Sequence, residues 1–391
     1  MKNRFFFIAI VGLTSVYLME PGALPAQSAY ASHWLPAGGS PTEPGKWYVA
    51  ADSAQQALTR EFWLADHQYY THGNDKTGFD YWWNAHALDV LVDGYTRTKK
   101  PWYIKQMRSM CEGMYKKNRG EWPNEYYDDM EWMALSCVRA FQATGDVYYK
   151  KITDLLWEDI KKGWAAQLGG GMLWKKTPPP SRNACSNGPA IILAARLYRL
   201  DKHPEDLALA QHIYQWERAT LVDSVSGAVW DNINIRDGVP VTDKRMVLTY
   251  NVGTWLGGGV ELYQITGEKQ YLADAVKSAG LVVDDRNKFS PGGILKGENR
   301  SDGGLFKGIF IRYFTQLILE KGLDKKLRAH YAVYMKANGE SLLEKATLPV
   351  VYLFGTDWRS LPSATDMDCS VQLSGIMLLE ALDRLSAAQL L

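Results

Sequence analysis

Apolar residues recur at helical spacing through most of this chain, and turn motifs separate one such stretch from the next. One stripe runs through residues 81–95, a second through 130–141 and a third through 190–200. Sustained alternation with a period of two is scarce, and the short segment 350–354 is the exception. The pattern therefore predicts a mostly α-helical protein.

The turns between these stripes form a weak internal repeat. Residues 98–103, 144–149 and 266–271 each begin with Thr and end with Tyr, and residues 200–206 are a looser copy. Their spacing of roughly 45 to 65 residues fits a repeated helical hairpin. Helical pairs repeated over a whole domain can close into a toroid, whereas an open solenoid should show a stricter period and capping repeats.

The first residues are typical of a secretory signal. Lys2 and Arg4 precede the apolar run 5–19, and residues 29–31 read Ala-Tyr-Ala, a small-x-small cleavage site. The run is shorter than the roughly 20 apolar residues that a spanning helix needs, so we expect cleavage and no stable membrane insertion. We predict a signal peptide at 1–31 and a secreted or periplasmic protein.

After the signal we predict an N-terminal tail at 32–44 and a single domain at 45–391. Glycine-rich breaks and the triple proline at 178–180 interrupt the helices, but none of them resembles a domain linker. The expected length is ample for one large hydrophobic core. We expect the protein to be a monomer.

Composition narrows the choice of ligand. The net charge is +1 and the pI is near 7.6, so the chain has no basic excess with which to neutralise nucleic-acid phosphates or an anionic membrane. Its 15 Trp and 22 Tyr favour a neutral ligand, because flat aromatic faces stack on the C–H faces of sugars. Many of these aromatic residues are nevertheless expected in the core.

Four cysteines are too few for a disulfide framework, although an exported protein could pair some of them. They stand at positions 111, 137, 185 and 369, with neither a C-x-x-C motif nor a His–Cys cluster that would indicate structural zinc. Buried thiols are the more economical interpretation. We expect no metal and no cofactor.

Asp128 and Asp129 are the best clue to chemistry. They stand side by side where an apolar helical stretch begins. Neighbouring carboxylates suit glycoside hydrolysis, in which one acid stays protonated while its partner is ionised. Adjacent side chains can bring their carboxyl groups to about 5 Å, the separation of a retaining enzyme. The alternative is a pair of solvated acids that the helix dipole favours.

Seven sequence blocks then carry a specific resemblance, which covers nearly the whole expected mature chain. In order they are YWWNAHALDVLVD (81–93), YDDMEWMAL (127–135), GGMLW (170–174), SNGPAIILAARLY (186–198), YNVGTWLG (250–257), FKGIFIRY (306–313) and QLSG (372–375). Together they resemble glycoside hydrolase family 76, the endo-α-1,6-mannanases with an (α/α)6 toroid fold. The resemblance implies an α-mannan polysaccharide or manno-oligosaccharide as substrate.

The family resemblance also implies roles for the acidic pair. By position, Asp128 would be the nucleophile of a retaining mechanism and Asp129 the general acid/base; the residues alone agree on the pair but do not order it. We expect the ionised Asp128 and the surrounding Tyr126, Tyr127 and Trp132 to raise the pKa of Asp129.

Further residues in the matching blocks could contact mannose hydroxyls or stack on the sugar ring. These are Trp83, Asn84, His86, Tyr127, Asn187, Trp230, Asp231, Tyr250, Asn251 and Lys307. Structural roles compete with several of these: His86 as a core histidine, Asn187 as a helix cap and Asn251 as part of a turn. Lys307 would either order a carboxylate or be solvated.

The chain departs from the expected family pattern beside the presumed sugar subsites. Asn84 and Val252 stand where glutamine is expected, and residues 184–189 read Ala-Cys-Ser-Asn-Gly-Pro in place of a segment such as Asn-Ser-Ile-Ser-Asn. These changes bear on linkage preference and subsite number more than on the chemistry.

Three other functions compete with hydrolysis. A transglycosylase would pass the same covalent intermediate to a sugar hydroxyl, and a non-catalytic glycan-binding protein would keep the aromatic residues without needing both acids. The Asp-Asp-Met-Glu segment at 128–131 also faintly resembles the magnesium motif of helical terpene synthases, but its last acid stands one residue too early. We therefore favour a retaining α-mannan hydrolase.

Overall fold

The computed structural model describes residues 45–165, 167–178, 180–363 and 367–391. The predicted signal peptide and N-terminal tail lie outside the described residues. Within them the helices are α1 (Lys46–Phe62), α2 (Tyr81–Thr98), α3 (Pro101–Lys117), α4 (Tyr127–Thr144), α5 (Val147–Ile160), α6 (Ala184–Asp201), α7 (Pro204–Thr220), α8 (Thr249–Thr266), α9 (Lys269–Asp284), α10 (Asp302–Leu319), α11 (Lys325–Lys345) and α12 (Cys369–Ala387).

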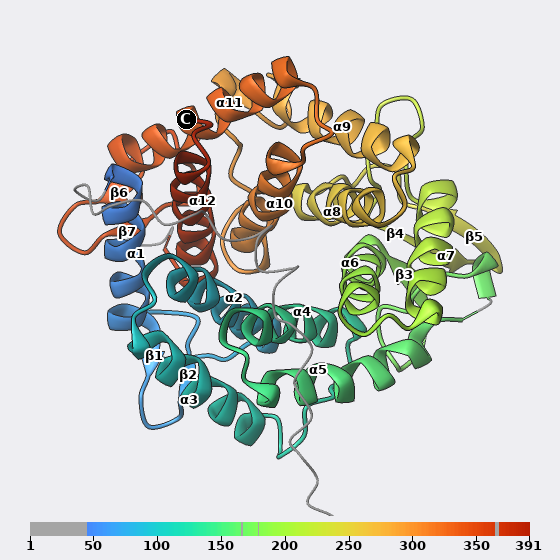
Figure 1. Cartoon of the computed structure of the whole chain (residues 1–391), viewed down its shortest axis with the longest axis horizontal. Coiled ribbons are helices and arrows are strands. Elements are labelled where there is room, and N and C mark those ends of the chain that lie inside the picture. Colours follow the sequence, from blue (N-terminus) through green and yellow to red (C-terminus); the bar gives the residue numbers. More distant parts are fainter. Residues whose placement is uncertain (1–44, 166, 179, 364–366) are drawn as a thin grey trace, which may run out of the picture. The chain divides into compact units, whose positions relative to one another are not determined.

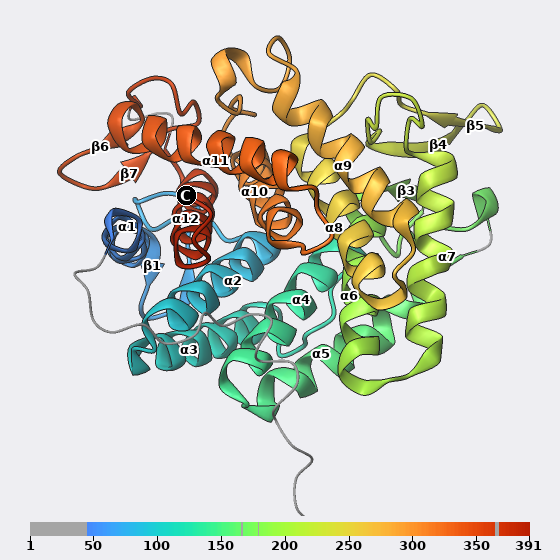
Figure 2. The ribbon, with the colours of Figure 1, turned by 45° about the horizontal axis from the view of Figure 1, so that its top comes forward.

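The even-numbered helices form an inner ring and the odd-numbered helices surround it (Figures 1 and 2). Each inner helix packs against the next one, from α2 round to α12, and α12 packs against α2 and closes the ring. The predicted (α/α)6 toroid is confirmed. The open-solenoid alternative is wrong, because the first and last inner helices are in contact.

Short strands occupy the connections that lead into the inner helices. β1 (Trp63–Leu64) pairs with β2 (Tyr69–Tyr70), and β6 (Thr347–Leu348) pairs with β7 (Leu353–Phe354). The third sheet has the order β3 (Ser181–Asn183), β4 (Asn232–Arg236) and β5 (Val239–Thr242), all antiparallel. Of the alternating segment 350–354, only Leu353–Phe354 is a strand.

The internal repeat corresponds to the turn from an inner to an outer helix. α2, α4, α6 and α8 each end before a residue in the left-handed region: Lys99 (φ 56°), Gly145 (φ 74°), Lys202 (φ 63°) and Gly267 (φ 74°). This residue reverses the chain, and an extended residue then starts the outer helix. Asp146 caps α5 by accepting a hydrogen bond of 2.9 Å from the amide of Tyr148. The hairpin interpretation of these motifs is confirmed.

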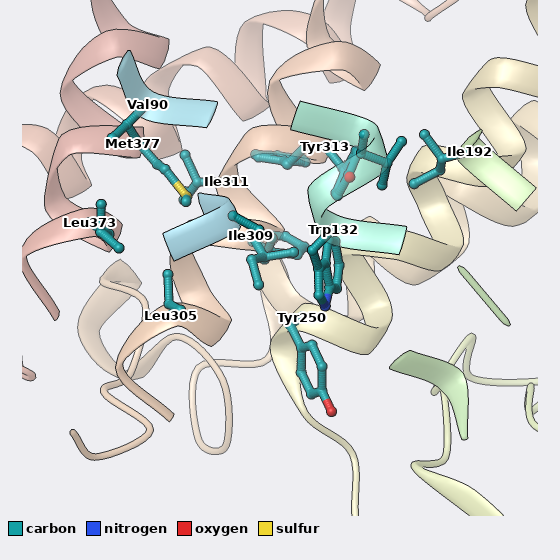
Figure 3. Packing of buried hydrophobic residues seen from close by; sticks show 14 of the residues in the cluster. Val90, Trp132, Ile192, Tyr250, Leu305, Ile309, Ile311, Tyr313, Leu373 and Met377 are labelled. Atoms are coloured by element: carbon teal, nitrogen blue, oxygen red, sulfur yellow. The ribbon is translucent and has the colours of Figure 1, made fainter. Parts of the chain in front are cut away.

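The inner helices are buried on nearly every side, so their apolar residues form one cluster inside the ring. Figure 3 labels members from all six inner helices: Val90, Trp132, Ile192, Tyr250, Leu305, Ile309, Ile311, Tyr313, Leu373 and Met377. Glycines allow close packing here. A Cβ atom at Gly253 would lie 2.6 Å from the Cα of Phe310, and one at Gly308 would lie 2.6 Å from the Cα of Ser374.

A buried network of two arginines and two aspartates links three inner helices. Arg312 of α10 contacts Asp89 (Nε to Oδ2, 2.8 Å) and Asp93 (Nη2 to Oδ2, 2.9 Å) of α2. Arg139 of α4 pairs with the same two aspartates. Burial alone would raise the pKa of Asp93, but Arg139 and Arg312 hold it below its usual value. Asp93 therefore stays ionised within the network.

The described cysteines are all buried and unpaired, as the economical interpretation predicted. Among the helices that the structure describes, none combines the length and the apolar character that crossing a membrane requires.

Replacing Arg312 by Met should lower the free energy of unfolding by about 3–5 kcal/mol, because Asp89 and Asp93 would each lose a partner while remaining buried. Urea unfolding followed by circular dichroism measures the change. Arg245→Met removes an arginine from an exposed pair with Asp243 and should leave stability nearly unchanged. Equal stability of Arg312→Met and the parent would contradict the structural role of the network.

Candidate active site

The acidic pair lies in the first turn of α4, at the end of the ring where the inner helices begin. Asp128 accepts two hydrogen bonds at Oδ2, from Nε1 of Trp174 (3.2 Å) and from Sγ of Cys185 (3.3 Å). Its Oδ1 is inaccessible to water and has no partner among the described residues. Burial raises the pKa of Asp128, although these hydrogen bonds act in the opposite direction.

Asp129 has a different environment from its neighbour. Its Oδ2 accepts a hydrogen bond of 2.6 Å from Nδ2 of Asn124. Burial and then the negative charges of Asp128, Asp80 and Asp302 raise the pKa of Asp129 well above its usual value. A proton is therefore held more firmly here than on an ordinary aspartate.

Asp80 and Asp302 extend the acidic cluster beyond the predicted pair. Asp80 caps α2 by accepting from the amide of Trp82 (3.2 Å), and burial and then Asp302 raise the pKa of Asp80. Asp302, the first residue of α10, accepts from Nε1 of Trp83 (3.0 Å). This contact places Trp83 at the cluster. Neither of these acids, nor Asn124, was predicted from the sequence, because all three lie in segments distant in the chain or outside the helical stripe.

Aromatic rings stand beside the acids; Tyr126, Trp174 and Phe306 are partly exposed, whereas Tyr250 is buried. Trp174 packs on Tyr126 with ring centroids 5.2 Å apart, and Tyr250 stacks on Phe306 at 4.1 Å with an interplanar angle of 9°. Trp174 lay in a matching block but was not predicted as a site residue, and its contact with Asp128 shows that it belongs here. Of the three aromatic residues predicted around the acids, Tyr126 packs on Trp174, the indole that donates to Asp128.

A second group of predicted residues meets near Tyr250. Nδ2 of Asn251 donates to Oδ1 of Asp231 (2.9 Å), and the amide of Ala184 donates to the carbonyl of Asp231 (2.8 Å). Trp230 is partly exposed, and Nζ of Lys244 lies 4.5 Å from the centroid of its ring. These contacts tie the β4 segment to the beginnings of α6 and α8.

Asn84 and Asn187 are fully engaged by backbone groups. Oδ1 of Asn84 accepts from the amide of Tyr70 (2.8 Å), and its Nδ2 donates to the carbonyl of Tyr70 (2.9 Å). Asn187 makes the same pair of bonds with the amide (2.8 Å) and carbonyl (3.3 Å) of Met172. Both residues are buried at the fourth position of an inner helix and hold the preceding segment in place.

Gln372 and Val252 occupy the equivalent fourth positions of α12 and α8. Oε1 of Gln372 accepts from the amide of Phe354 (3.2 Å), and Nε2 donates to the carbonyl of Tyr352 (3.2 Å). Val252 has no side-chain amide with which to make such a bond. The departures from the family pattern at Asn84 and Val252 thus fall at one position of the repeat. In α2, α6 and α12 a side-chain amide at this position holds the segment that leads into the helix.

His86, Tyr127 and Lys307 are also buried. His86 lies between the rings of Trp82 (5.6 Å) and Trp132 (4.7 Å), and burial holds its pKa well below the usual value. The amide of Tyr127 donates to the carbonyl of Trp174 (2.9 Å).

Lys307 is held inside the protein and is not solvated at the surface. Its Nζ donates to the carbonyl of Thr356 and lies 3.8 Å from the centroid of the Trp358 ring. Burial lowers the pKa of Lys307 to about 7, although Asp357 and Glu298 act in the opposite direction. Thus, within the described ranges, Lys307 hydrogen-bonds no carboxylate, and its side chain is shielded from bulk solvent.

No group of three or more His, Cys, Asp or Glu side chains in the described ranges could hold a metal ion.

Residues 46–372 match the model of glycosyl hydrolase family 76. This chain belongs to that family. Among solved structures, the α-1,6-mannanase GH76A of Salegentibacter sp. HEL1_6 is 43% identical, with a TM-score of 0.84 over 88% of this chain and 100% of the mannanase chain. A Listeria innocua protein is 34% identical, with a TM-score of 0.79 over 88% of this chain and 98% of its own.

Curated relatives of this family 76 chain are more distant. A Schizosaccharomyces pombe relative is 26% identical over 271 residues, which are 62% of this chain and 60% of the relative. Mannan endo-1,6-alpha-mannosidase DCW1 of Candida glabrata is 28% identical over 123 residues, which are 30% of this chain and 27% of the relative. The chain thus spans less than two thirds of the length of these curated relatives.

Behind the acidic pair, this family 76 chain buries two glutamates. Glu131 of α4 and Glu217 of α7 are inaccessible to solvent, and their four carboxyl oxygens have no partner among the described residues. Burial raises the pKa of both glutamates well above the usual value, and the charges of Asp128 and then Glu217 add to the effect on Glu131. We infer that both carboxyl groups are protonated in the folded protein.

Glu217→Gln should make the protein relatively more stable as the pH rises. A raised pKa in the folded state stabilises the parent fully below the unfolded pKa of about 4.3, and this contribution is lost as the pH rises towards the folded pKa. Glutamine keeps the shape without a titrating proton. Thermal unfolding from pH 5 to pH 8 should show a growing difference in favour of the variant. Glu205→Gln, at an exposed position of α7, is the control, and a difference independent of pH would contradict the protonated state.

Proposed function

We propose that this family 76 chain is a retaining glycoside hydrolase that cleaves α-1,6-linked mannan inside the polymer. The observation that carries the proposal is the pair Asp128 and Asp129, two adjacent, half-buried carboxyl groups of raised pKa in an aromatic site. Such a pair supplies both the nucleophile and the proton donor of a double displacement.

The named relatives support this substrate. The Salegentibacter mannanase, 43% identical to this chain, has been solved as inactive variants substituted at two consecutive aspartates, in complex with α-1,6-mannotriose and α-1,6-mannotetrose. Asp128 and Asp129 are consecutive aspartates in this chain. By this likeness the substrate is a neutral α-mannan chain, which agrees with the near-neutral charge of the protein.

In the first step Asp129 donates its proton to the glycosidic oxygen as the bond from that oxygen to C1 breaks. A carboxylate oxygen of Asp128 bonds to C1 at the same time, which leaves a mannosyl ester on the enzyme and releases the shortened chain. The charges of Asp80 and Asp302 favour this assignment, because they add to the pKa of Asp129.

In the second step Asp129, now ionised, takes a proton from water while the water oxygen bonds to C1 and the ester to Asp128 breaks. The two inversions together retain the configuration at C1. In this proposal the chain needs no cofactor and acts as a secreted or periplasmic monomer. The location is suggested by Lys2, Arg4 and the apolar run that follows them.

The test is incubation of the mature chain with debranched α-1,6-mannan beside the Asp128→Ala/Asp129→Ala variant, with reducing ends and product lengths measured. We expect a ladder of short manno-oligosaccharides from the parent alone. Products that grow longer when a manno-oligosaccharide acceptor is added would support the transglycosylase alternative instead. Equal mannan binding by both proteins, without turnover by either, would contradict the hydrolase function and indicate a glycan-binding protein.

The pH dependence of kcat/KM should reflect both acids. The first step needs Asp128 ionised and Asp129 protonated, so activity falls below the pKa of Asp128 and above that of Asp129. Because both pKa values are raised, the active range should lie above the usual aspartate value of about 3.9.

Asn124→Ala should move the basic limb of this profile to higher pH. The hydrogen bond from Asn124 favours the ionised form of Asp129, so its removal raises the pKa of Asp129 further. Initial rates at low mannan concentration across the pH range give the measurement, and the acidic limb serves as the internal reference. A basic limb that moves to lower pH would show that Asp129 is not the proton donor.

A further inference from the structure

Three neighbouring inner helices place a polar side chain at the same point of the repeat. Asp128, Cys185 and Tyr250 are the second residues of α4, α6 and α8. Because consecutive inner helices pack side by side in the toroid, equivalent positions become spatial neighbours. A sequence separation of 57 residues between Asp128 and Cys185 is thereby reduced to direct contact.

The side chains of this row meet one another in the order Tyr250, Cys185, Asp128. The hydroxyl of Tyr250 interacts electrostatically with the sulfur of Cys185, and Sγ of Cys185 donates to Oδ2 of Asp128 at 3.3 Å. The same oxygen accepts from Nε1 of Trp174 at 3.2 Å. Cys185 is 4% exposed, so the thiol meets these groups with little competition from water.

Ring stacking fixes the side chain of Tyr250, the residue at one end of the row. The ring of Tyr250 lies parallel to Phe306 of α10, with centroids 4.1 Å apart, which fixes the direction of its hydroxyl. Figure 3 shows this hydroxyl directed away from the labelled aliphatic side chains of the core. Phe306, Tyr250, Cys185 and Asp128 therefore connect four consecutive inner helices, and the connection ends on the acid.

We propose that Cys185 is a positioning residue for Asp128: its thiol, oriented by Tyr250, holds Oδ2 and so sets the direction and the ionisation of the carboxylate that attacks the sugar. The proposal rests on the function proposed above. It explains why the cysteine sits at this point of the repeat, where a purely apolar side chain would leave Trp174 as the one donor to Oδ2 among the described contacts.

The physical reason is the preference of a hydrogen-bond donor for a charged acceptor. A donor to a carboxylate stabilises its ionised form, so removing the donor raises the pKa of that carboxyl group. The ionisation of Asp128 also responds to the other titratable groups around it. On the several segments that meet at the site, these groups are Asp80, Asp129, Glu131, Cys185, Asp231, Tyr250 and Asp302.

The test compares four single variants by their pH profiles of kcat/KM on a short α-1,6-manno-oligosaccharide. Cys185→Ala removes the donor, Cys185→Ser restores one, and Tyr250→Phe removes the hydroxyl while keeping the ring on Phe306. Cys111→Ala makes the same chemical change at a buried thiol of α3, away from the acids.

For Cys185→Ala we expect the acidic limb to move up by about 0.5 to 1 pH unit and the rate below that limb to fall about 3- to 10-fold. Tyr250→Phe should shift the limb in the same direction by less. Cys185→Ser should restore most of the parent profile, and Cys111→Ala should leave the limb in place. A structural effect alone would change stability without moving the limb, so thermal unfolding is measured for each variant.

A second measurement follows the ionisation of Asp128 directly and does not depend on catalysis. The 13C resonance of its carboxyl group, assigned by its loss in Asp128→Asn, should titrate at higher pH in Cys185→Ala than in the parent. An unchanged titration and an unchanged acidic limb in an active Cys185→Ala enzyme would overturn the positioning role, as would equal losses in the Ala and Ser variants. An inactive parent would instead overturn the proposed function, and with it any role of Cys185 in catalysis.

Discussion

The buried network of Arg139, Arg312, Asp89 and Asp93 is the interaction on which the ring most depends. It joins α2, α4 and α10, helices that are far apart in the sequence, and it does so with two charges of each sign. Each charge would be costly to bury alone, so the four groups are stable only together. The network therefore requires a closed ring, in which these helices converge.

A buried charge also needs distant partners where α12 meets α1 and α2 and the ring closes. Arg97 of α2 binds Glu380 of α12 at 2.9 Å, and Gln55 of α1 donates to the same glutamate at 3.1 Å. Side chains of α1 and α2 thus satisfy a charge on α12. Because the partner residues are about 280 to 325 positions away, the polar groups at this seam have partners only when the whole domain has folded.

The same architecture produces the chemistry of the site. A carboxylate in the first turn of a helix is favoured by the helix dipole by about 0.3–1 kcal/mol, which by itself would lower its pKa. At Asp129 the opposing effects prevail, because burial and the charges of Asp128, Asp80 and Asp302 all disfavour ionisation. These charges lie at the N-terminal ends of α2, α4 and α10. The protonation of Asp129 therefore depends on three helix ends that the toroid brings together.

Some features of this protein follow from residues that are near one another in the sequence, and others follow from contacts between distant residues. The helical stripes, the hairpin repeat and the adjacency of Asp128 and Asp129 are local patterns, and the sequence alone determined them because they depend on near neighbours. Whether each predicted polar residue touches the site depends on long-range contacts. Asn84 and Asn187 carry the right chemistry for a sugar, yet their amides are satisfied by the backbone of preceding segments.

Conversely, Cys185, Trp174 and Asp302 could not be assigned to the site from the sequence. A lone thiol or indole has no periodic signature. Cys185 and Asp302 reach the acids because equivalent ends of the inner helices converge, and Trp174 reaches Asp128 from the segment that precedes β3. The sequence by itself thus determined the fold class, the family resemblance and the adjacency of the two acids. Only the tertiary structure decided which groups surround that pair and how firmly each acid holds its proton, because burial and charge act through space and not along the chain.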